Sequence, residues 1–591
     1  LRVFMQKKIF MALIFLYMIA FSANNISLSE DMPLKNPNAV PELKKYEQSA
    51  EVKEVIELSK DNTSDEKQRD TMKSLTNVEE AKNYVQESDD VEKFLIKQVE
   101  FPTKSEVFTE TQLQQLVVPI IDEEVSLKEI QSVVNDISKF YIINDYITSY
   151  AYLPPQDFSS GIVKIELSEG RVGDISISGN KYTKTKYIED RLHAESGKIF
   201  KLRALEEDLI KFNNTNSVKL DARISQGKDP NSTDIKINAD DPFPFHLTGV
   251  FDNAGRDGSG LLRGGAVLSA DSLFGVRDKM TIGSFLGRHS QVAFGDYHIP
   301  INKYGTNAGF LFSYNNLSTL GGMYDRYSGN AFSYSGYITH PIISKSDFTL
   351  DSFSSANFKY STTFFDKSEI DDTNVFSLTQ GFSLRKDTPK GIWYSGHYAS
   401  VGMYMLSGQH NFFKYEGNIT RLHDFGHGII GQFRLGGQYS PNRNLPWIEQ
   451  YQLGGISTVR GFSESLLLGK SGYMASAELL LPLPFLPEKA GNEKLGYVNL
   501  RKMIKGAVFV DHGGVFPSGL YDESLSKHHF LTSVGLGLRI ALKENLSARL
   551  YWGFGLGNNR FESSQPTGRF HFELSSSPDF SKLLKRHSDK L

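Results

Sequence analysis

The chain of 591 residues contains no cysteine, which excludes disulfide bonds, cysteine-ligated structural zinc and thiol catalysis. Long hydrophobic runs are also missing. Past the N-terminal segment no stretch approaches the roughly 20 apolar residues that a membrane-spanning helix needs, so helical membrane proteins are excluded. A net charge of −4 argues against nucleic acid as a partner. The length predicts several domains.

Residues 1–23 are typical of a secretory signal peptide. Met5 is followed by Lys7 and Lys8, by the apolar run "IFMALIFLYMIAF" and by the small residues Ser22 and Ala23. This order predicts export from the cytoplasm. An N-terminal membrane anchor is the alternative, although a run of about 13 apolar residues is short for a bilayer.

Two polar segments follow the signal. Within residues 24–60, "PELKKYEQSAEVKEVIELSK" predicts a short, mostly polar helix, because Leu43, Tyr46 and Ala50 share one face amid lysine and glutamate. Residues 61–90 are charged and lack a core pattern, so they are interpreted as a linker. A disordered tail over both segments is the open alternative.

Residues 91–169 and 170–241 repeat one small α+β pattern. The first copy has a strand in "VEKFLIKQVEF", helical spacing in "TETQLQQLVVPI" and "SLKEIQSVVNDISKFYI", and strands in "YITSYAYL" and "GIVKIELSEG". The second repeats the order with "RVGDISISGN", then the helices "TKTKYIEDRLHA" and "LRALEEDLIKFNN", then "SVKLDARIS" and "STDIKINAD". Each copy is expected to bury a modest core between its sheet and its helices.

From residue 242 to 580 the pattern changes to segments of about ten alternating residues. In "SVGLGLRIAL" one face is apolar and the other is polar or glycine, and "LSARLYWGFGL" and "RFHFELS" repeat this alternation. After export, such strands fit a transmembrane β-barrel with a polar lumen, and the length accommodates about 16 antiparallel strands. A soluble all-β domain is the alternative. Residues 581–591 form a basic tail after the last strand.

This order of segments resembles the TpsB transporters of two-partner secretion, the haemolysin-activator, FhaC and ShlB-like members of the outer-membrane-protein-85 superfamily. Three motifs carry the resemblance. They are Leu153, Pro154, Pro155 and Gln156 in "YITSYAYLPPQDFSSGIVKIELSEGRVGDISISGN", a stretch that spans the two α+β units, Gly454, Gly455, Val459, Arg460, Gly461 and Phe462 in "LPWIEQYQLGGISTVRGF", and Phe509, Asp511 and Gly513 in "FVDHGG". The chain departs from the family at Asp145, Tyr150 and Thr458, where glycine, arginine and serine are usual.

The resemblance implies a fold and a location. It implies an all-β transmembrane barrel in the outer membrane of a Gram-negative bacterium, two α+β POTRA domains (the family's name for such units) in the periplasm, and an N-terminal plug helix. The glycine-rich stretch corresponds to the family's long loop that folds into the lumen. A guanidinium out of water needs a bidentate acceptor, and the resemblance implies that Asp511 accepts from Arg460.

The function implied is protein transport without catalysis. The POTRA domains would capture an unfolded partner exoprotein, an adhesin, a haemolysin or a contact-dependent toxin, and the barrel, embedded in outer-membrane lipid, would secrete it. No nucleotide-binding or hydrolase motif occurs in the sequence, so no cofactor and no metal are predicted. An insertase of the BamA type is the alternative, although that class typically has more POTRA domains. An enzyme is disfavoured because the 14 histidines have no motif spacing, and His512 is interpreted as a lumen or loop residue.

Overall fold

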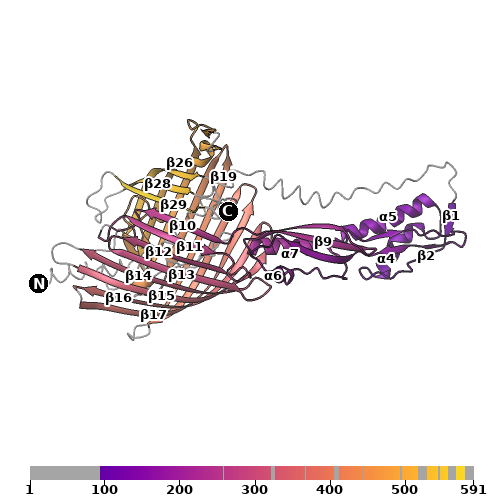
Figure 1. The fold of residues 1–591 in the computed structure, drawn as a ribbon, viewed down its shortest axis with the longest axis horizontal. Helices are drawn as coiled ribbons and strands as arrows, with labels where there is room; N and C mark the ends of the chain where they lie inside the picture. Colours follow the sequence, from indigo (N-terminus) through magenta and orange to yellow (C-terminus); the bar gives the residue numbers. More distant parts are fainter. Residues whose placement is uncertain are drawn as a thin grey trace, which may run out of the picture. The chain divides into compact units, whose positions relative to one another are not determined.

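The computed structural model describes residues 93–578 except 257, 321–325, 367, 405–410, 443–444, 493–495, 517–528, 543–545 and 557–567. The predicted signal peptide, plug helix, linker and basic tail lie outside the described residues. The chain divides into two compact units, one ending at Pro242 and one covering the strands from Phe243 onward (Figure 1). None of the described helices has the length and apolar character needed to cross a membrane.

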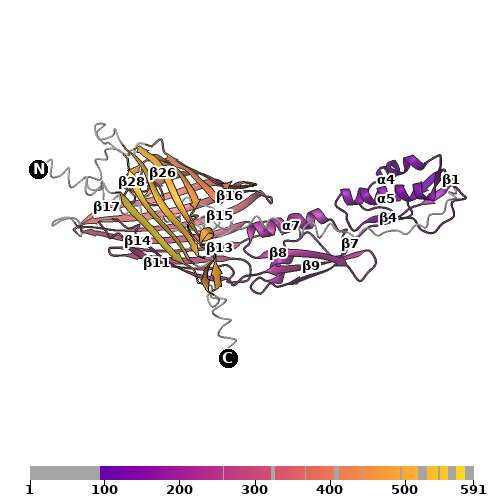
Figure 2. The same ribbon diagram turned by 90° about the horizontal axis from the view of Figure 1, so that it is seen from above.

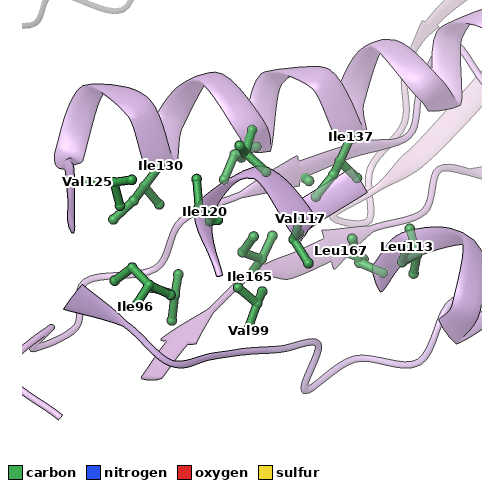
Figure 3. Packing of buried hydrophobic residues seen from close by; sticks show 14 of the residues in the cluster. Ile96, Val99, Leu113, Val117, Ile120, Val125, Ile130, Ile137, Ile165 and Leu167 are labelled. Atoms are coloured by element: carbon green, nitrogen blue, oxygen red, sulfur yellow. The ribbon is translucent and has the colours of Figure 1, made fainter. Parts of the chain in front are cut away.

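The first α+β fold packs its helices against short strands. Its elements are β1 (Lys93–Ile96), β2 (Gln98–Glu100), α4 (Glu110–Val117), the 3-10 turn η2 (Val118–Ile120), β3 (Glu123–Ser126), α5 (Leu127–Ile143), β4 (Tyr150–Tyr152), β5 (Ile162–Lys164) and β6 (Glu166–Ser168). Helix α5 begins with a capping box, in which Ser126 N donates to Glu129 Oε2 at 2.7 Å. The α5 side chains Ile130, Val134 and Ile137 are fully buried in an apolar cluster that also contains Ile96 (Figure 3).

The strand predicted over "YITSYAYL" is shorter than expected. Only Tyr150–Tyr152 forms β4, because Tyr146 to Ser149 turn after α5: Tyr146 N donates to Tyr141 O, and Ser149 N donates to Tyr146 O, both at 3.0 Å. Asp145 stands at a positive φ of 72°, where the family usually has glycine. The residue before the turn therefore adopts the conformation for which glycine is favoured.

The second α+β fold has a three-stranded sheet. Its elements are β7 (Arg171–Ser178), α6 (Thr185–Glu189), α7 (Leu202–Thr215), β8 (Lys219–Gln226) and β9 (Ser232–Asp240), with strand order β7-β9-β8 (Figure 2). The helix predicted over residues 183–194 was too long, since α6 ends at Glu189. The reason is a tertiary contact: the His193 amide donates to the Asp208 carboxylate on α7 rather than to a preceding helical carbonyl.

The predicted barrel is present, and it closes with 16 antiparallel strands. Its strands are β10 (Phe245–Asp252), β11 (Arg263–Ala270), β12 (Lys279–Gly287), β13 (Ser290–Pro300), β14 (Asn307–Leu320), β15 (Arg326–Ser344), β16 (Phe348–Phe365), β17 (Ser368–Thr388), β18 (Gly391–Tyr404), β19 (Phe412–Gly426), β20 (Ile429–Tyr439), β23 (Ser471–Pro482), β26 (Ile504–Phe516), β27 (Phe530–Leu542), β28 (Leu546–Gly555) and β29 (Arg569–Ser576). Strands β10 and β29 close the barrel through four residue pairs, from Gly249 with Ser576 to Asp252 with Glu573.

Short elements fill the connections of the barrel. The loop between β20 and β23 contains η3 (Trp447–Glu449), β21 (Tyr451–Leu453) and β22 (Leu467–Gly469), and β21 pairs with β22. The connection between β23 and β26 contains β24 (Ala490–Asn492), β25 (Gly496–Val498) and α8 (Leu500–Met503).

The alternation read from the sequence matches the two faces of the wall. On β27, Leu536 is 61% exposed on the outside, whereas Ser533 and Arg539 are buried on the inside. The neighbouring strand β28 continues the pattern, with Trp552 outside and Tyr551 inside. An apolar outer face and a polar lumen are what a barrel in lipid requires.

Candidate functional site in the barrel lumen

The connection between β20 and β23 packs against the inward face of the barrel. Leu453, Val459 and Phe462 from this connection form one buried apolar cluster with Val515 of β26 and Leu531 of β27. We call residues 445–470 the lumen loop. Its buried position matches the in-folded loop that the resemblance implies.

Arg460 lies at the tip of the lumen loop and is 1% exposed. Its Nε donates to Asp511 Oδ2 at 2.8 Å and its Nη2 donates to Asp511 Oδ1 at 2.9 Å, which makes a bidentate pair. The Arg460 backbone amide donates to the same carboxylate at 3.0 Å. Asp511 therefore compensates the charge of Arg460, and its carboxylate accepts hydrogen bonds from both the side chain and the backbone of this residue.

A second carboxylate completes the site. Arg460 Nη1 donates to Glu478 Oε2 at 2.6 Å, and the other oxygen of Glu478 accepts from Arg539 Nε at 2.8 Å and from Tyr551 Oη at 2.9 Å. All of these side chains are buried. The pairing matters because removal of one partner from a buried ion pair leaves an uncompensated charge, which costs about 3–5 kcal/mol. We call Arg460, Asp511, Glu478, Arg539 and Tyr551 the tip cluster.

Phe509 explains why the strand motif pairs an aromatic residue with Asp511. The two residues are two positions apart on β26, so both face the lumen. The guanidinium carbon of Arg460 lies 3.6 Å from the centre of the Phe509 ring. The aromatic face and the carboxylate thus bind the same cation from two sides.

Two motif glycines allow the loop to approach the wall. Gly461 has a φ of 90°, and a Cβ there would lie 2.8 Å from the backbone of Gly553 on β28. Gly461 N also donates to His571 Nε2 at 3.0 Å. At Gly513, a Cβ would lie 2.7 Å from a methyl group of Leu453 in the lumen loop. Larger residues at Gly461 or Gly513 would push the loop away from the strands.

His512 does not face the lumen, and the prediction of a lumen or loop position was wrong. It follows the inward Asp511 on the same strand, so alternation turns its side chain outward. There its ring nitrogens lie 2.8 Å from Thr532 Oγ1 and 3.1 Å from Tyr473 Oη.

Sequence reasoning missed Glu478 and Tyr551. Glu478 is the one acid in the alternating strand "SGYMASAELLLP", on the inward face with Ser476. A lone carboxylate on the lumen face of a strand was the available signal. Its partner could not be identified, because Arg460 precedes it by 18 residues and Arg539 follows it by 61.

The motif from Leu153 to Gln156 lies inside the first α+β unit, between β4 and β5. Gln156 Nε2 donates to Lys164 O, and Lys164 N donates to Gln156 Oε1, both at 2.7 Å. The amide side chain thereby pairs with β5 as a strand would. Pro154 and Pro155 stand directly before it and after β4.

A closed 16-stranded barrel with a charged lumen loop, preceded by two α+β folds, defines a protein of the outer-membrane-protein-85 architecture. Residues 94–170 match the POTRA domain of ShlB type. Residues 231–540 match the haemolysin secretion/activation protein family ShlB/FhaC/HecB, and the chain belongs to this family.

Individual proteins agree with this assignment. The chain is 25% identical over 461 residues to the heme/hemopexin transporter protein HuxB of Haemophilus influenzae, which covers 71% of this chain and 78% of HuxB. Its fold is similar to CdiB from Escherichia coli, with a TM-score of 0.62 and 19% identity over 90% of this chain and 98% of CdiB. BamA from Haemophilus ducreyi lacking POTRA domains 1–3 is similar in fold, with a TM-score of 0.50 and 14% identity over 82% of this chain and all of that BamA chain.

The family establishes the general function and location. The chain is a two-partner secretion transporter, a barrel of the outer membrane with its POTRA domains in the periplasm, and it serves a partner exoprotein. Only a similarity of fold to BamA supports the insertase alternative, whereas the family match is to secretion proteins.

Proposed function

We propose that the second POTRA domain captures the exoprotein as an added β-strand along the outer edge of β8, before the unfolded chain passes through the barrel. The cargo class is a large exported adhesin, haemolysin or contact-dependent toxin. Transport runs without nucleotide hydrolysis, and folding of the cargo outside the cell biases its movement outward. The single observation that supports the proposal is the unequal protection of the two POTRA sheet edges.

The edge of β8 is open over its second half. In the part of the chain that the structure describes, β8 pairs only with β9. Gly227 N donates to Ser232 O across the hairpin, so the odd-numbered residues of β8 bond to β9 and the even-numbered ones present N–H and C=O groups to the outer edge. Ile224 and Gln226 are such edge positions. Their backbone groups can bind an extended peptide.

Asn213 of α7 covers only the first edge position. Leu220 N donates to Asn213 Oδ1 at 2.7 Å, and Asn213 Nδ2 donates to Leu220 O at 3.0 Å. The Asn213 amide thus occupies the place of one residue of an added strand. A bound segment would begin where this cover ends, at Ala222.

The equivalent edge in the first POTRA domain is closed. Ala151 N donates to Ser138 Oγ of α5 at 3.0 Å, so a helix side chain covers the centre of β4. The strand then runs into Pro154 and Pro155, which have no N–H to offer. This contrast favours capture on β8 over capture on β4.

We further propose that the polar helix within residues 24–60 is a removable plug of the lumen. Its sequence is polar enough for an aqueous channel, and a linker of about 30 residues has a reach of roughly 30 Å, comparable to the bilayer core. The helix lies outside the described residues, so this assignment rests on sequence and resemblance.

Edge prolines test the capture proposal. Ile224→Pro and Gln226→Pro each remove one outward N–H without removing a bond to β9. Each should lower binding of a cargo fragment to the periplasmic unit by about three- to tenfold, since a backbone hydrogen bond contributes roughly 1 kcal/mol. Binding is measured by titration, and secretion in cells should fall with it.

Matched side-chain variants are the controls. Ile224→Ala and Gln226→Ala shorten the same side chains but keep the edge N–H, so they should bind cargo nearly as the parent does. Equal loss in the proline and alanine variants would assign recognition to side chains. Unchanged binding in both prolines would remove β8 as the capture site.

A further inference from the structure

A second buried ionic cluster holds the first part of the lumen loop. Glu449, in η3, is 1% exposed. Its Oε1 lies 2.7 Å from Lys359 Nζ on β16, and its Oε2 lies 2.7 Å from Lys414 Nζ on β19. Lys414 also pairs with Glu416 at 3.2 Å. We call Glu449, Lys359, Lys414 and Glu416 the base cluster.

Backbone contacts and packing hold the same segment. Gln438 Nε2 of β20 donates to Glu449 O at 2.8 Å and to Lys470 O at 3.0 Å, so one side chain ties the start of the loop to its end. Ile448 packs in a buried apolar cluster with Val375 of β17 and Phe412 of β19. The segment that carries Glu449 is therefore held to the wall by apolar packing and hydrogen bonds as well as by the ion pairs of the base cluster.

The base and tip clusters have opposite charge patterns and share no residue. At the tip, a loop cation sits between two wall anions, Asp511 and Glu478. At the base, a loop anion sits between two wall cations, Lys359 and Lys414. The strands also differ, since the wall residues of the tip cluster lie on β23, β26, β27 and β28, whereas those of the base cluster lie on β16 and β19. Neither cluster can replace the other, because exchanging partners would place like charges together.

We propose that Glu449 is a positioning residue, and that the base cluster clamps the lumen loop to the wall independently of the Arg460 contact. The lumen loop is thus attached to the barrel wall at two points, and each point lies on different strands. Release of the tip leaves the base in place, and release of the base leaves the tip in place. Cargo consequently passes beside a loop whose base stays on the β16–β19 wall. This inference concerns the loop alone and does not depend on where the POTRA domains bind cargo.

Single cysteines report on each clamp, since the chain contains none of its own. Ile448→Cys marks the base and Val459→Cys marks the tip, both at positions that are at most 1% exposed. Labelling of intact cells with a membrane-impermeant maleimide should be slow at both. Adding Glu449→Gln should speed labelling of Ile448→Cys by at least about tenfold, because two buried cations lose their shared anion and the segment opens locally. Val459→Cys should change by less than about twofold.

Two further variants distinguish local release of the loop from a general loss of barrel stability: the reciprocal variant Arg460→Ala, and a variant whose base cluster carries no charge. Arg460→Ala should expose Val459→Cys and leave Ile448→Cys protected. Combining Glu449→Gln with Lys359→Met, Lys414→Met and Glu416→Gln removes all four charges of the base cluster, which should restore heat-modifiable barrel yield but leave Ile448→Cys accessible. If Glu449→Gln fails to assemble, Lys359→Gln is the milder substitute, because Lys414 still pairs with Glu449. Lys359→Gln removes one of the two ion pairs of Glu449, so labelling of Ile448→Cys should still become faster.

Three results would overturn the proposal. They are unchanged labelling of Ile448→Cys in the Glu449→Gln background, equal exposure of both reporters by either variant, and full protection of Ile448→Cys in the uncharged quadruple variant. The second result would mean that the loop is one cooperative unit. The third would mean that packing of Ile448 holds the base without the ion pairs.

Discussion

The periplasmic unit and the barrel bury opposite kinds of side chain. The core of the first POTRA domain consists of apolar residues such as Ile130, Val134 and Ile165, all 0% exposed. The most deeply buried groups of the barrel include Arg460 and Asp511, while Leu536 and other large apolar residues are exposed on its outer wall. The same chain thus meets two solvents, water around the first unit and lipid around the second.

The difference determines what holds each part together. Burial of apolar surface stabilises the POTRA domain, so the location of its core follows from helical and strand periodicity. The barrel is stabilised in lipid mainly by its closed ladder of backbone hydrogen bonds. The lumen charges add little to that ladder, but they fix the position of the loop. We therefore expect substitutions in the two regions to affect different measurements.

The largest expected effect is the loss of the second POTRA domain, which carries the proposed capture edge. Deleting residues 170–241 should abolish secretion, because it removes the proposed capture edge on β8. The barrel should still assemble, because the barrel strands bond only among themselves in the described chain. Secretion of the partner and heat-modifiability of the barrel measure the two properties. Normal secretion from this deletion would contradict the capture role proposed for the second POTRA domain.

A charge placed on an apolar position should destabilise each region, but for a different reason in the POTRA core than on the lipid-facing wall. Val134→Asp places a carboxylate in the apolar POTRA core and should unfold that domain, at a cost of about 4 kcal/mol or more. Leu536→Arg places a charge in the lipid-facing wall and should cost roughly 2–4 kcal/mol without preventing closure. Protease resistance measures the first, and urea unfolding in lipid vesicles measures the second.

Conservative partners control both substitutions. Asn135→Asp puts the same acid on the exposed face of α5, and Leu536→Phe keeps the outer wall apolar, so both should be nearly neutral. If Val134→Asp were tolerated while Asn135→Asp was not, the assignment of the α5 core face would be wrong. A harmless Leu536→Arg would contradict the lipid-facing assignment of β27.

The sequence predicted what depends on periodicity and could not predict what depends on distant contacts. Alternation in "SVGLGLRIAL" predicted which β27 residues face lipid, and apolar spacing predicted α5. Asp511 was linked to Arg460 through family resemblance, since 51 residues separate them. Glu449, which is buried, and Asn213, which is half-buried, went unnoticed because the local sequence around a glutamate or an asparagine does not indicate how exposed the side chain is. Their partners lie on other elements of the fold.

The role of the Arg460–Asp511 contact in transport is tested most directly by a double-mutant cycle on the two residues, measured as secretion at constant amounts of assembled barrel. Arg460→Ala should reduce secretion the most, because Arg460 bonds both Asp511 and Glu478, and Asp511→Ala should reduce it less. The double variant should be no worse than Arg460→Ala alone, which gives a coupling energy of about 1–3 kcal/mol. Losses that add would show that the two residues act separately, and that the Arg460 contact with Asp511 does not hold the loop for transport.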